Sequence, residues 1–286
     1  MEISERRACE LMDQPRSTQR YRSSQPDKDK PLVEAIRRLA KKYPRYGYRL
    51  ITAKLRQEGW RVNHKRVQRL WAKEGLQVPY RRKRKQSRGS SANSCSVKVP
   101  EYINHVWTYD FIEDRTEDGR KLKFLTVLDE YTRESLEIKV GRSIRAKDVI
   151  NVLEYLFAVR GTPGFIRSDN GPEFIADAIK GWLSERGVAT LYIEPGCPWE
   201  NGYGESFNGT FRNELLDHEL FGSVKEAEVL AEQWRLEYNR HRPHSSLGYR
   251  TPAEFAARCI PSSSATPRPQ EYTTDNVGNS LIQCGT

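Results

Sequence analysis

The order of hydrophobic patterns between residues 106 and 240 is the feature that most restricts the fold of this 286-residue chain. Three strand patterns come first, and helices and strands then alternate. The predicted strands cover 106–112, 123–128, 135–140, 164–168 and 190–193, and the predicted helices cover 145–160, 172–186, 201–216 and 224–240. Three meandering strands followed by alternation predict a mixed α/β sheet with helices on both sides.

A separate helical region comes earlier, at residues 29–78. Its hydrophobic residues follow helical spacing over 30–43, over 48–58 and again from Asn63, which is a favourable N-cap. Three short helices with tight turns predict a small bundle similar to a helix-turn-helix DNA-binding domain. The outer faces carry the basic residues Arg49, Lys54, Arg56, Lys65, Arg66 and Arg69.

Charge is distributed unevenly along the chain. Residues 1–99 hold 27 lysines and arginines against 9 acidic residues, whereas residues 100–286 hold 21 against 29. The solvated face of an ordinary bundle could also be basic, but so large an excess favours contact with a polyanion such as DNA. The second part is mildly acidic, so we expect its carboxylates to serve a purpose other than binding a polyanion.

These patterns divide the chain into five segments. Residues 1–28 are expected to be a flexible arm or a partial helix-turn-helix, and 29–78 to be the helical DNA-binding domain. Residues 79–99 form a basic linker, 100–260 the α/β core, and 261–286 a disordered tail rich in Ser, Thr and Pro. Within the linker, we expect DNA phosphates to be contacted by Arg81, Arg82 and Lys83.

Several classes of protein are excluded by composition. No apolar run approaches the roughly 20 residues that a membrane-spanning helix needs, and no signal-peptide core follows the N-terminus. The five cysteines are scattered and form no CxxC pair, so neither a disulfide framework nor a zinc site is indicated. We therefore expect an intracellular protein without a membrane partner.

Three acidic residues fall where the predicted sheet would bring them together. Asp110 lies inside the first strand, Asp169 follows the fourth strand, and Glu205 lies on the helix predicted for 201–216. An acid within an apolar strand is costly to bury unless a partner or a metal compensates its charge. The carboxyl end of a strand, followed by a turn and a helix, is a usual place for functional groups in α/β sheets.

Carboxylates from different elements suit the cleavage and joining of phosphodiesters. Two divalent ions about 4 Å apart activate the nucleophile and stabilise the leaving oxygen, and Mg²⁺ prefers oxygen ligands. Each of the three acids taken alone could instead be structural. Asp129, Glu130 and Glu173 are competing candidates, and Asp129, at the end of the second strand, could line the cleft.

Four motifs resemble those of the OrfB-type transposases of the insertion-sequence-three family, whose core is related to retroviral integrases. They are residues 107–111, 168–174, 201–208 and 241–249. The 35 residues between Asp169 and Glu205, and the basic residue Arg212 seven positions after Glu205 on the same helix face, also fit the family. Residues 45–49 and 66–70 resemble its helical DNA-binding segment. The resemblance covers about residues 30–258 and predicts a ribonuclease-H-like core, which the order of elements also matches.

The resemblance implies a DDE transposase, which cleaves DNA with the help of metal ions and then attacks another strand with a DNA 3′-hydroxyl. Asp110, Asp169 and Glu205 would hold two Mg²⁺ or Mn²⁺ ions. Arg212 would contact DNA near the reacting phosphate, and Asn170 and Asn208 would either contact DNA or support the metal ligands. The expected partners are the element's terminal repeats, target DNA and further copies of the chain, in the bacterial cytoplasm and at the nucleoid when DNA is bound.

Two departures from the family pattern lead to further expectations. Gly204 directly precedes Glu205, where the family more often has a larger residue; glycine weakens a helix by about 1 kcal/mol, which predicts a looser Glu205. Residues 6–21 resemble the end of a helix-turn-helix without its beginning. The working enzyme of this family is often a frameshift fusion, so we expect an upstream OrfA-type product as partner or fusion.

Two other functions remain open at this level. The chain could be a DNA-binding regulator with an inactive catalytic domain, although a dead copy need not retain three acids. It could also be a ribonuclease-H-like nuclease that cuts without joining, although the basic bundle and the 241–249 segment favour the transposase.

Overall fold

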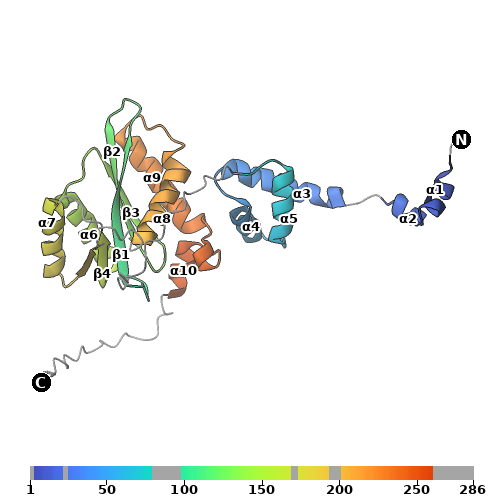
Figure 1. Cartoon of the computed structure of the whole chain (residues 1–286). Coiled ribbons are helices and arrows are strands. Elements are labelled where there is room, and N and C mark those ends of the chain that lie inside the picture. Colours follow the sequence, from blue (N-terminus) through green and yellow to red (C-terminus); the bar gives the residue numbers. More distant parts are fainter. Residues whose placement is uncertain (1–2, 22–24, 79–97, 169–172, 193–200, 260–286) are drawn as a thin grey trace, which may run out of the picture.

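The computed structural model describes residues 3–21, 25–78, 98–168, 173–192 and 201–259. Figure 1 shows a helical part and a sheet with helices on both of its faces. Within the described ranges, no helix is long and apolar enough to cross a membrane. The linker residues Arg81, Arg82 and Lys83, the acid Asp169, the neighbouring Asn170 and the tail 261–286 lie outside the described residues.

The helical part contains the three helices that the sequence predicts, α3 (Gln25–Lys42), α4 (Tyr48–Gln57) and α5 (His64–Lys73). Asn63 caps α5 as expected, because its side-chain oxygen accepts a hydrogen bond from the backbone N–H of Lys65 at 2.9 Å. The helices α1 (Glu5–Leu11) and α2 (Arg16–Gln19) precede them. α3 begins five residues earlier than predicted and continues through Pro31. Its apolar face packs with α4 and α5 into a single core.

The sheet has five strands in the order β3-β2-β1-β4-β5. Its strands are β1 (Val106–Arg115), β2 (Lys121–Asp129), β3 (Ser135–Gly141), β4 (Phe165–Ser168) and β5 (Ala189–Tyr192). β1, β2 and β3 form the predicted antiparallel meander, while β4 lies parallel to β1 and β5 parallel to β4. This arrangement confirms the mixed, ribonuclease-H-like sheet.

Helices cover both faces of the sheet because each face is apolar (Figure 1). One face packs against α6 (Ala146–Arg160) and α7 (Glu173–Glu185). The other packs against α8 (Gly202–Phe211), η2 (Arg212–Leu216) and α9 (Val224–His241). The short η3 (Ser245–Leu247) and α10 (Pro252–Cys259) follow.

The helix predicted over 201–216 changes its winding near its end. α8 is an α-helix as far as Phe211, and η2 continues it as one π-helical segment. The wider turn places the adjacent Leu215 and Leu216 both in the core. A π-helical segment of this kind is frequent at functional sites.

The helical part docks on the sheet's α9 side. The hydroxyl of Tyr43 donates to Glu237 Oε1 at 2.7 Å, and Arg45 Nε donates to Asn213 Oδ1 at 2.9 Å. Lys54 Nζ donates to the carbonyl oxygen of His241 at 3.2 Å. Lys54, a basic residue of the predicted outer face, is therefore buried between the two parts.

Candidate active site

Asp110 lies on the face of the sheet that α8 covers. Successive β1 side chains alternate between the two faces, so Trp107 and Tyr109 join the core beneath α6 and α7. Thr108, Asp110 and Ile112 point to the opposite side, where Ile112 joins the core beneath α8 and α9. Asp110 is half-buried there, between a buried threonine and a buried isoleucine.

The Asp110 carboxylate is held by neutral donors. Asn208 Nδ2 donates to Oδ2 of Asp110 at 2.7 Å, and the backbone N–H of Phe111 donates to Oδ1 at 2.7 Å. The Asn208 side-chain oxygen in turn accepts from the hydroxyl of Thr126 at 3.1 Å. Thr126 is the residue opposite Asp110 on β2. Asn208 therefore orients the acid and is itself oriented, so that both of its polar atoms are used.

Glu205 shares a helix face with Asn208. The two residues are three positions apart on α8, a spacing that makes side chains neighbours. Because Asn208 contacts Asp110, this spacing brings Glu205 to the same edge of β1. Glu205 is exposed. Glu205 thus lies one helical turn before the asparagine that contacts Asp110.

Three side-chain contacts run along α8 and β1. Thr108 donates to Asn201 Oδ1 at 3.1 Å, Asn208 bonds Asp110, and Arg212 Nη2 donates to the carbonyl oxygen of Glu113 at 3.0 Å. From the first contact to the last, the helix and the strand each advance by about 16 Å. The contacts between α8 and β1 therefore keep matching positions over about three helical turns.

Gly204 permits the close approach of α8 to this network and does not only weaken the helix. Gly204 is buried, and a Cβ atom built on it would lie 2.6 Å from Asn201 Oδ1. The Asn201 amide is itself buried and held by Thr108. The missing Cβ lets the first turn of α8 pack around Asn201, while the looser Glu205 expected from this glycine stays a prediction.

The second predicted acid, Asp169, and Asn170 lie outside the described residues, but the strand before them is described. β4 ends at Ser168 and runs parallel to β1, with Arg167 beside Thr108. Arg167 forms a buried ion pair with Glu130, Nη1 to Oε2 at 3.1 Å. Burial raises the pKa of Glu130 to about 7, although Arg167 opposes the shift. This pair anchors the end of β4.

Two of the competing acids, Asp129 and Glu130, have structural surroundings. Asp129 is buried, and its carboxylate accepts backbone N–H groups of Asn104, Tyr131 and Thr132 at 2.8, 2.8 and 3.1 Å. It organises the turn between β2 and β3 and does not line an open cleft. Glu130 forms the buried ion pair with Arg167. Glu173 is the first residue of α7.

The predicted DNA-contact residues of the helical part fall into two groups. Arg49 and Lys65 are exposed, although Arg49 Nε also donates to the Tyr48 hydroxyl at 3.2 Å. Arg66 and Arg69 instead form ion pairs with the buried Asp29, at 2.5 and 3.1 Å. The second pair therefore contributes to the internal structure of the helical domain.

The 241–249 motif contacts η2, the segment that continues α8. Arg242 forms a half-buried ion pair with Glu214 of η2, Nη2 to Oε1 at 2.9 Å, and its guanidinium also lies over the rings of Tyr46 and Tyr238. Arg242 thus joins η2 and α9 to the helical part. The family motif identifies this segment in the sequence. That Arg242 links these elements could be seen only from its contacts with residues distant in the chain.

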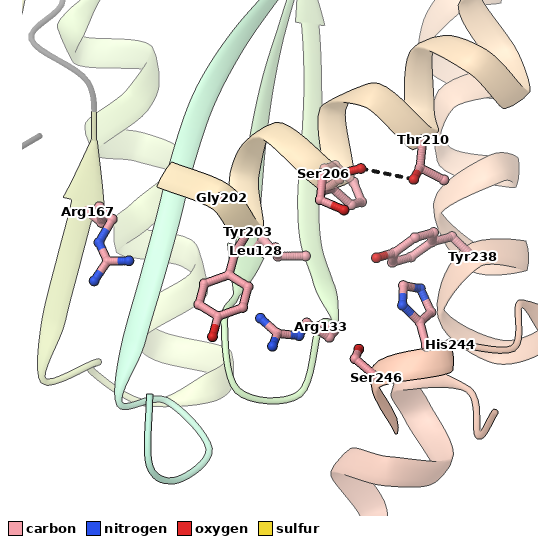
Figure 2. Close-up of a pocket in the computed structure, with 11 residues that line it drawn as sticks. Leu128, Arg133, Arg167, Gly202, Tyr203, Ser206, Thr210, Tyr238, His244 and Ser246 are labelled. Atoms are coloured by element: carbon pink, nitrogen blue, oxygen red, sulfur yellow. Dashed lines mark hydrogen bonds between the residues drawn. The ribbon is translucent and has the colours of Figure 1, made fainter. Parts of the chain in front are cut away.

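A cavity that the sequence did not reveal opens beside α8. Its volume is about 460 Å³, and Figure 2 shows its walls. They include Arg133 from the β2–β3 turn, Tyr203 and Ser206 of α8, Tyr238 of α9, and His244. Only the position of Tyr203 and Ser206 on either side of Glu205 could have drawn attention to it.

Among the described residues, no three His, Cys, Asp or Glu side chains gather closely enough to hold a metal ion. Asp110 and Glu205 offer carboxylate oxygens, which are the ligands that Mg²⁺ and Mn²⁺ prefer. The donor chemistry of the site therefore fits these ions.

Comparison with known proteins agrees with this architecture. The integrase core domain family matches residues 101–198 and 186–252, and an HTH-like domain family matches residues 26–84. An uncharacterized 31.7 kDa protein of insertion element IS407 from Burkholderia multivorans is 39% identical over 90% of this chain and 91% of its own length.

Further relatives and a solved structure also match most of the chain. An uncharacterized 39.2 kDa protein of insertion element IS476 from Xanthomonas euvesicatoria is 39% identical over 89% of this chain and 73% of its own length. The putative transposase InsK of IS150 from Escherichia coli is 26% identical over 87% and 91%. An integrase chain of a simian T-cell lymphotropic virus intasome aligns with a TM-score of 0.49 and 14% identity over 84% of this chain and 80% of its own. The chain belongs to the OrfB-type transposases of the insertion-sequence-three family, polynucleotidyl transferases with an HTH-like domain and an integrase core that act in DNA transposition.

Proposed function

We propose that this transposase cleaves and joins DNA strands at a divalent-metal site made by Asp110, Asp169 and Glu205. The observation that carries the proposal is the hydrogen bond between Asn208 and Asp110, because it brings the Glu205 face of α8 to the strand that holds Asp110. β4, which ends one residue before Asp169, lies beside the same strand. Three acids from three elements would then meet at one edge of the sheet.

The donor set fits two Mg²⁺ or Mn²⁺ ions, which when bound would supply Lewis acidity and lower the pKa of the attacking hydroxyl. Asn208 and Thr126 hold the Asp110 carboxylate in one orientation. Asn208 is therefore a positioning residue for Asp110 rather than a direct contact to DNA.

The reaction would proceed in two steps. Water first attacks a phosphodiester at the element end, one P–O bond breaks, and a 3′-hydroxyl is released. That hydroxyl then attacks a phosphodiester of target DNA, so one P–O bond forms as another breaks. Arg212 donates one N–H to Glu113 and is otherwise exposed; we expect its remaining N–H groups to bind a phosphate near the reacting bond.

A strand-transfer assay with pre-cut element ends and Mg²⁺ or Mn²⁺ tests the proposal. Joined product that disappears in Asp169→Asn and Glu205→Gln would support it. Cleavage without joining would support a nuclease, and DNA binding without either reaction would support a regulator.

We further propose that the chain works as a homo-oligomer on DNA and with an upstream OrfA-type product, as partner or fusion. The synapsis of two element ends requires at least two copies. Light scattering on the DNA complex measures the stoichiometry. Tight and specific binding of terminal repeats by this chain alone would contradict the need for the upstream product.

A further inference from the structure

The cavity beside α8 lies on the opposite side of that helix from its contacts with β1. Tyr203, Ser206 and Thr210 line it, at the spacing of one helical stripe. Asn201, Glu205 and Asn208 lie on the stripe that faces β1. The sheet residues Leu128 and Arg167, which flank Thr108 of β1, also line the cavity, so it lies close to the strand that carries Asp110.

Arg133 and Arg167 are the two arginines that line the cavity, and Arg167 is already paired with Glu130. The guanidinium carbon of Arg133 lies 3.6 Å from the centroid of the Tyr203 ring. Its Nη1 is buried without a hydrogen-bond partner, and no described acid lies within ion-pair distance of it. In Figure 2 it extends from the turn between Tyr203 and the segment of His244 and Ser246. Glu130 attracts the charge of Arg133 electrostatically without bonding it; a buried N–H donor without a hydrogen-bond partner is costly, and the guanidinium favours an anionic ligand in the cavity.

The backbone at Arg133 shows that its placement is not incidental. Arg133 has a φ of 62°, a left-handed conformation that non-glycine side chains rarely adopt. Asp129 accepts N–H groups of the same turn, and the backbone N–H of Arg133 donates to the carbonyl oxygen of Asp129 at 2.9 Å. Strain of this kind is concentrated at functional sites.

Apart from Arg167, which is paired with Glu130, the rest of the lining is uncharged and includes groups able to form hydrogen bonds. Burial, with smaller contributions from Arg242 and Arg133, lowers the pKa of His244 to about 3. His244 is therefore uncharged at physiological pH and offers both a donor and an acceptor. The hydroxyls of Ser206, Thr210 and Ser246 add further polar groups, and aromatic rings provide the apolar surface.

We propose that this cavity binds one unpaired nucleotide of a DNA strand, with its phosphate on Arg133 and its base among Tyr203, Tyr238 and His244. The proposal rests on DNA being the substrate and adds a subsite beside the acids. A volume of about 460 Å³ suits one nucleotide, but excludes a duplex, whose major groove alone is about 12 Å wide. Bases of single strands commonly stack on aromatic and arginine planes.

Photocrosslinking of the full chain tests the subsite directly. The probe is a short single-stranded oligothymidylate that carries one 5-iododeoxyuridine, irradiated in EDTA and mapped by peptide mass spectrometry. We expect adducts on Tyr203, Tyr238 or His244. Adducts confined to the helical DNA-binding domain, or the same yield from a duplex probe, would overturn the proposal. Competition by free thymidine monophosphate distinguishes a site for a free nucleotide from one for a strand.

Arg133→Met provides the matched comparison. It should lower the cavity adducts about tenfold, because a charge-assisted contact to phosphate is lost. Arg120→Met removes the same charge at an exposed turn and should not change them. Arg133→Lys should restore part of the yield, which separates loss of the contact from misfolding, and equal yields in Arg133→Met and Arg120→Met would contradict the subsite.

The result is separable from the metal-site proposal. Crosslinking needs neither metal nor reaction, so Asp110→Asn should retain the cavity adducts while it loses strand transfer. If Asp110→Asn kept strand transfer and the adducts remained, the metal site would be wrong and the subsite would stand. If the adducts were missing and Asp110→Asn lost strand transfer, the reverse would hold.

Discussion

Asp29 in the helical domain and Asp110 in the core are both acids removed from bulk solvent, but their partners differ. Asp29 receives the guanidinium groups of Arg66 and Arg69. Asp110 receives the neutral amide of Asn208 and a backbone N–H. Two arginines neutralise the charge of Asp29, which favours a structural role, whereas the Asn208 amide orients the Asp110 carboxylate beside α8, where the metal site is proposed.

The first prediction concerns the largest expected difference. Asp110→Asn should lower strand transfer by more than about a thousandfold, because a metal ligand is lost, while the melting temperature changes little. The matched control is Asp114→Asn, on the same strand, whose carboxylate also accepts the next backbone N–H at 2.8 Å. Equal activities of the two variants would remove the distinction between Asp110 and an ordinary strand acid.

Asp29→Asn should produce the opposite pattern. Two guanidinium groups lose their counterion, so we expect a loss of about 2 kcal/mol in the free energy of unfolding, reduced by their partial exposure. Strand transfer per folded molecule should be retained. Urea unfolding measures the change, with Glu113→Gln, which breaks an exposed pair with Lys121, as the control. A stability change no larger than that control would show that Asp29 is not structural.

Asn208→Ala removes the hydrogen-bond donor to Asp110 and leaves the Asp110 carboxylate itself in place. We expect a loss of about 10-fold to 100-fold in strand transfer, as for other residues that orient a metal ligand. Thr126→Val, which removes only the hydroxyl bound to Asn208, should have a smaller effect. Higher metal concentration should restore part of the activity. Loss of activity that no metal concentration restores would indicate a different role, and exposed Asn151→Ala is the control.

The smallest expected effect is the difference in DNA binding between an exposed basic residue, Lys65, and one that forms an ion pair, Arg69. Lys65→Met should weaken DNA binding and reduce the slope of log affinity against log salt by about 0.9, the value for one phosphate contact. Arg69→Met should change stability more than this slope, because Arg69 pairs with Asp29. Anisotropy titrations at several salt concentrations measure both. Equal slope changes would mean that Arg69 contacts DNA despite its pairing.

Much of the fold was predictable because it depends on local periodicity. The strand pattern of β1 and the cap at Asn63 depend only on residues that are close together in the sequence. Placing Asp110 inside a strand, and Glu205 and Arg212 on one helix, needed no tertiary information. The start of α3 was predicted too late because the hydrophobic spacing begins at Leu32, whereas α3 begins at Gln25 and continues through Pro31.

The sequence alone determined the order of elements and the family, and it supplied the acids that we propose for the site. Only the tertiary structure decided which groups meet: Asp29 with Arg66, 37 residues apart, and Asp110 with Asn208, 98 residues apart. It also showed that Gly204 makes room for Asn201 and that Arg133 faces a cavity. The physical reason is that periodicity reports which side of an element is buried, while hydrogen bonds and cavities depend on where distant elements pack.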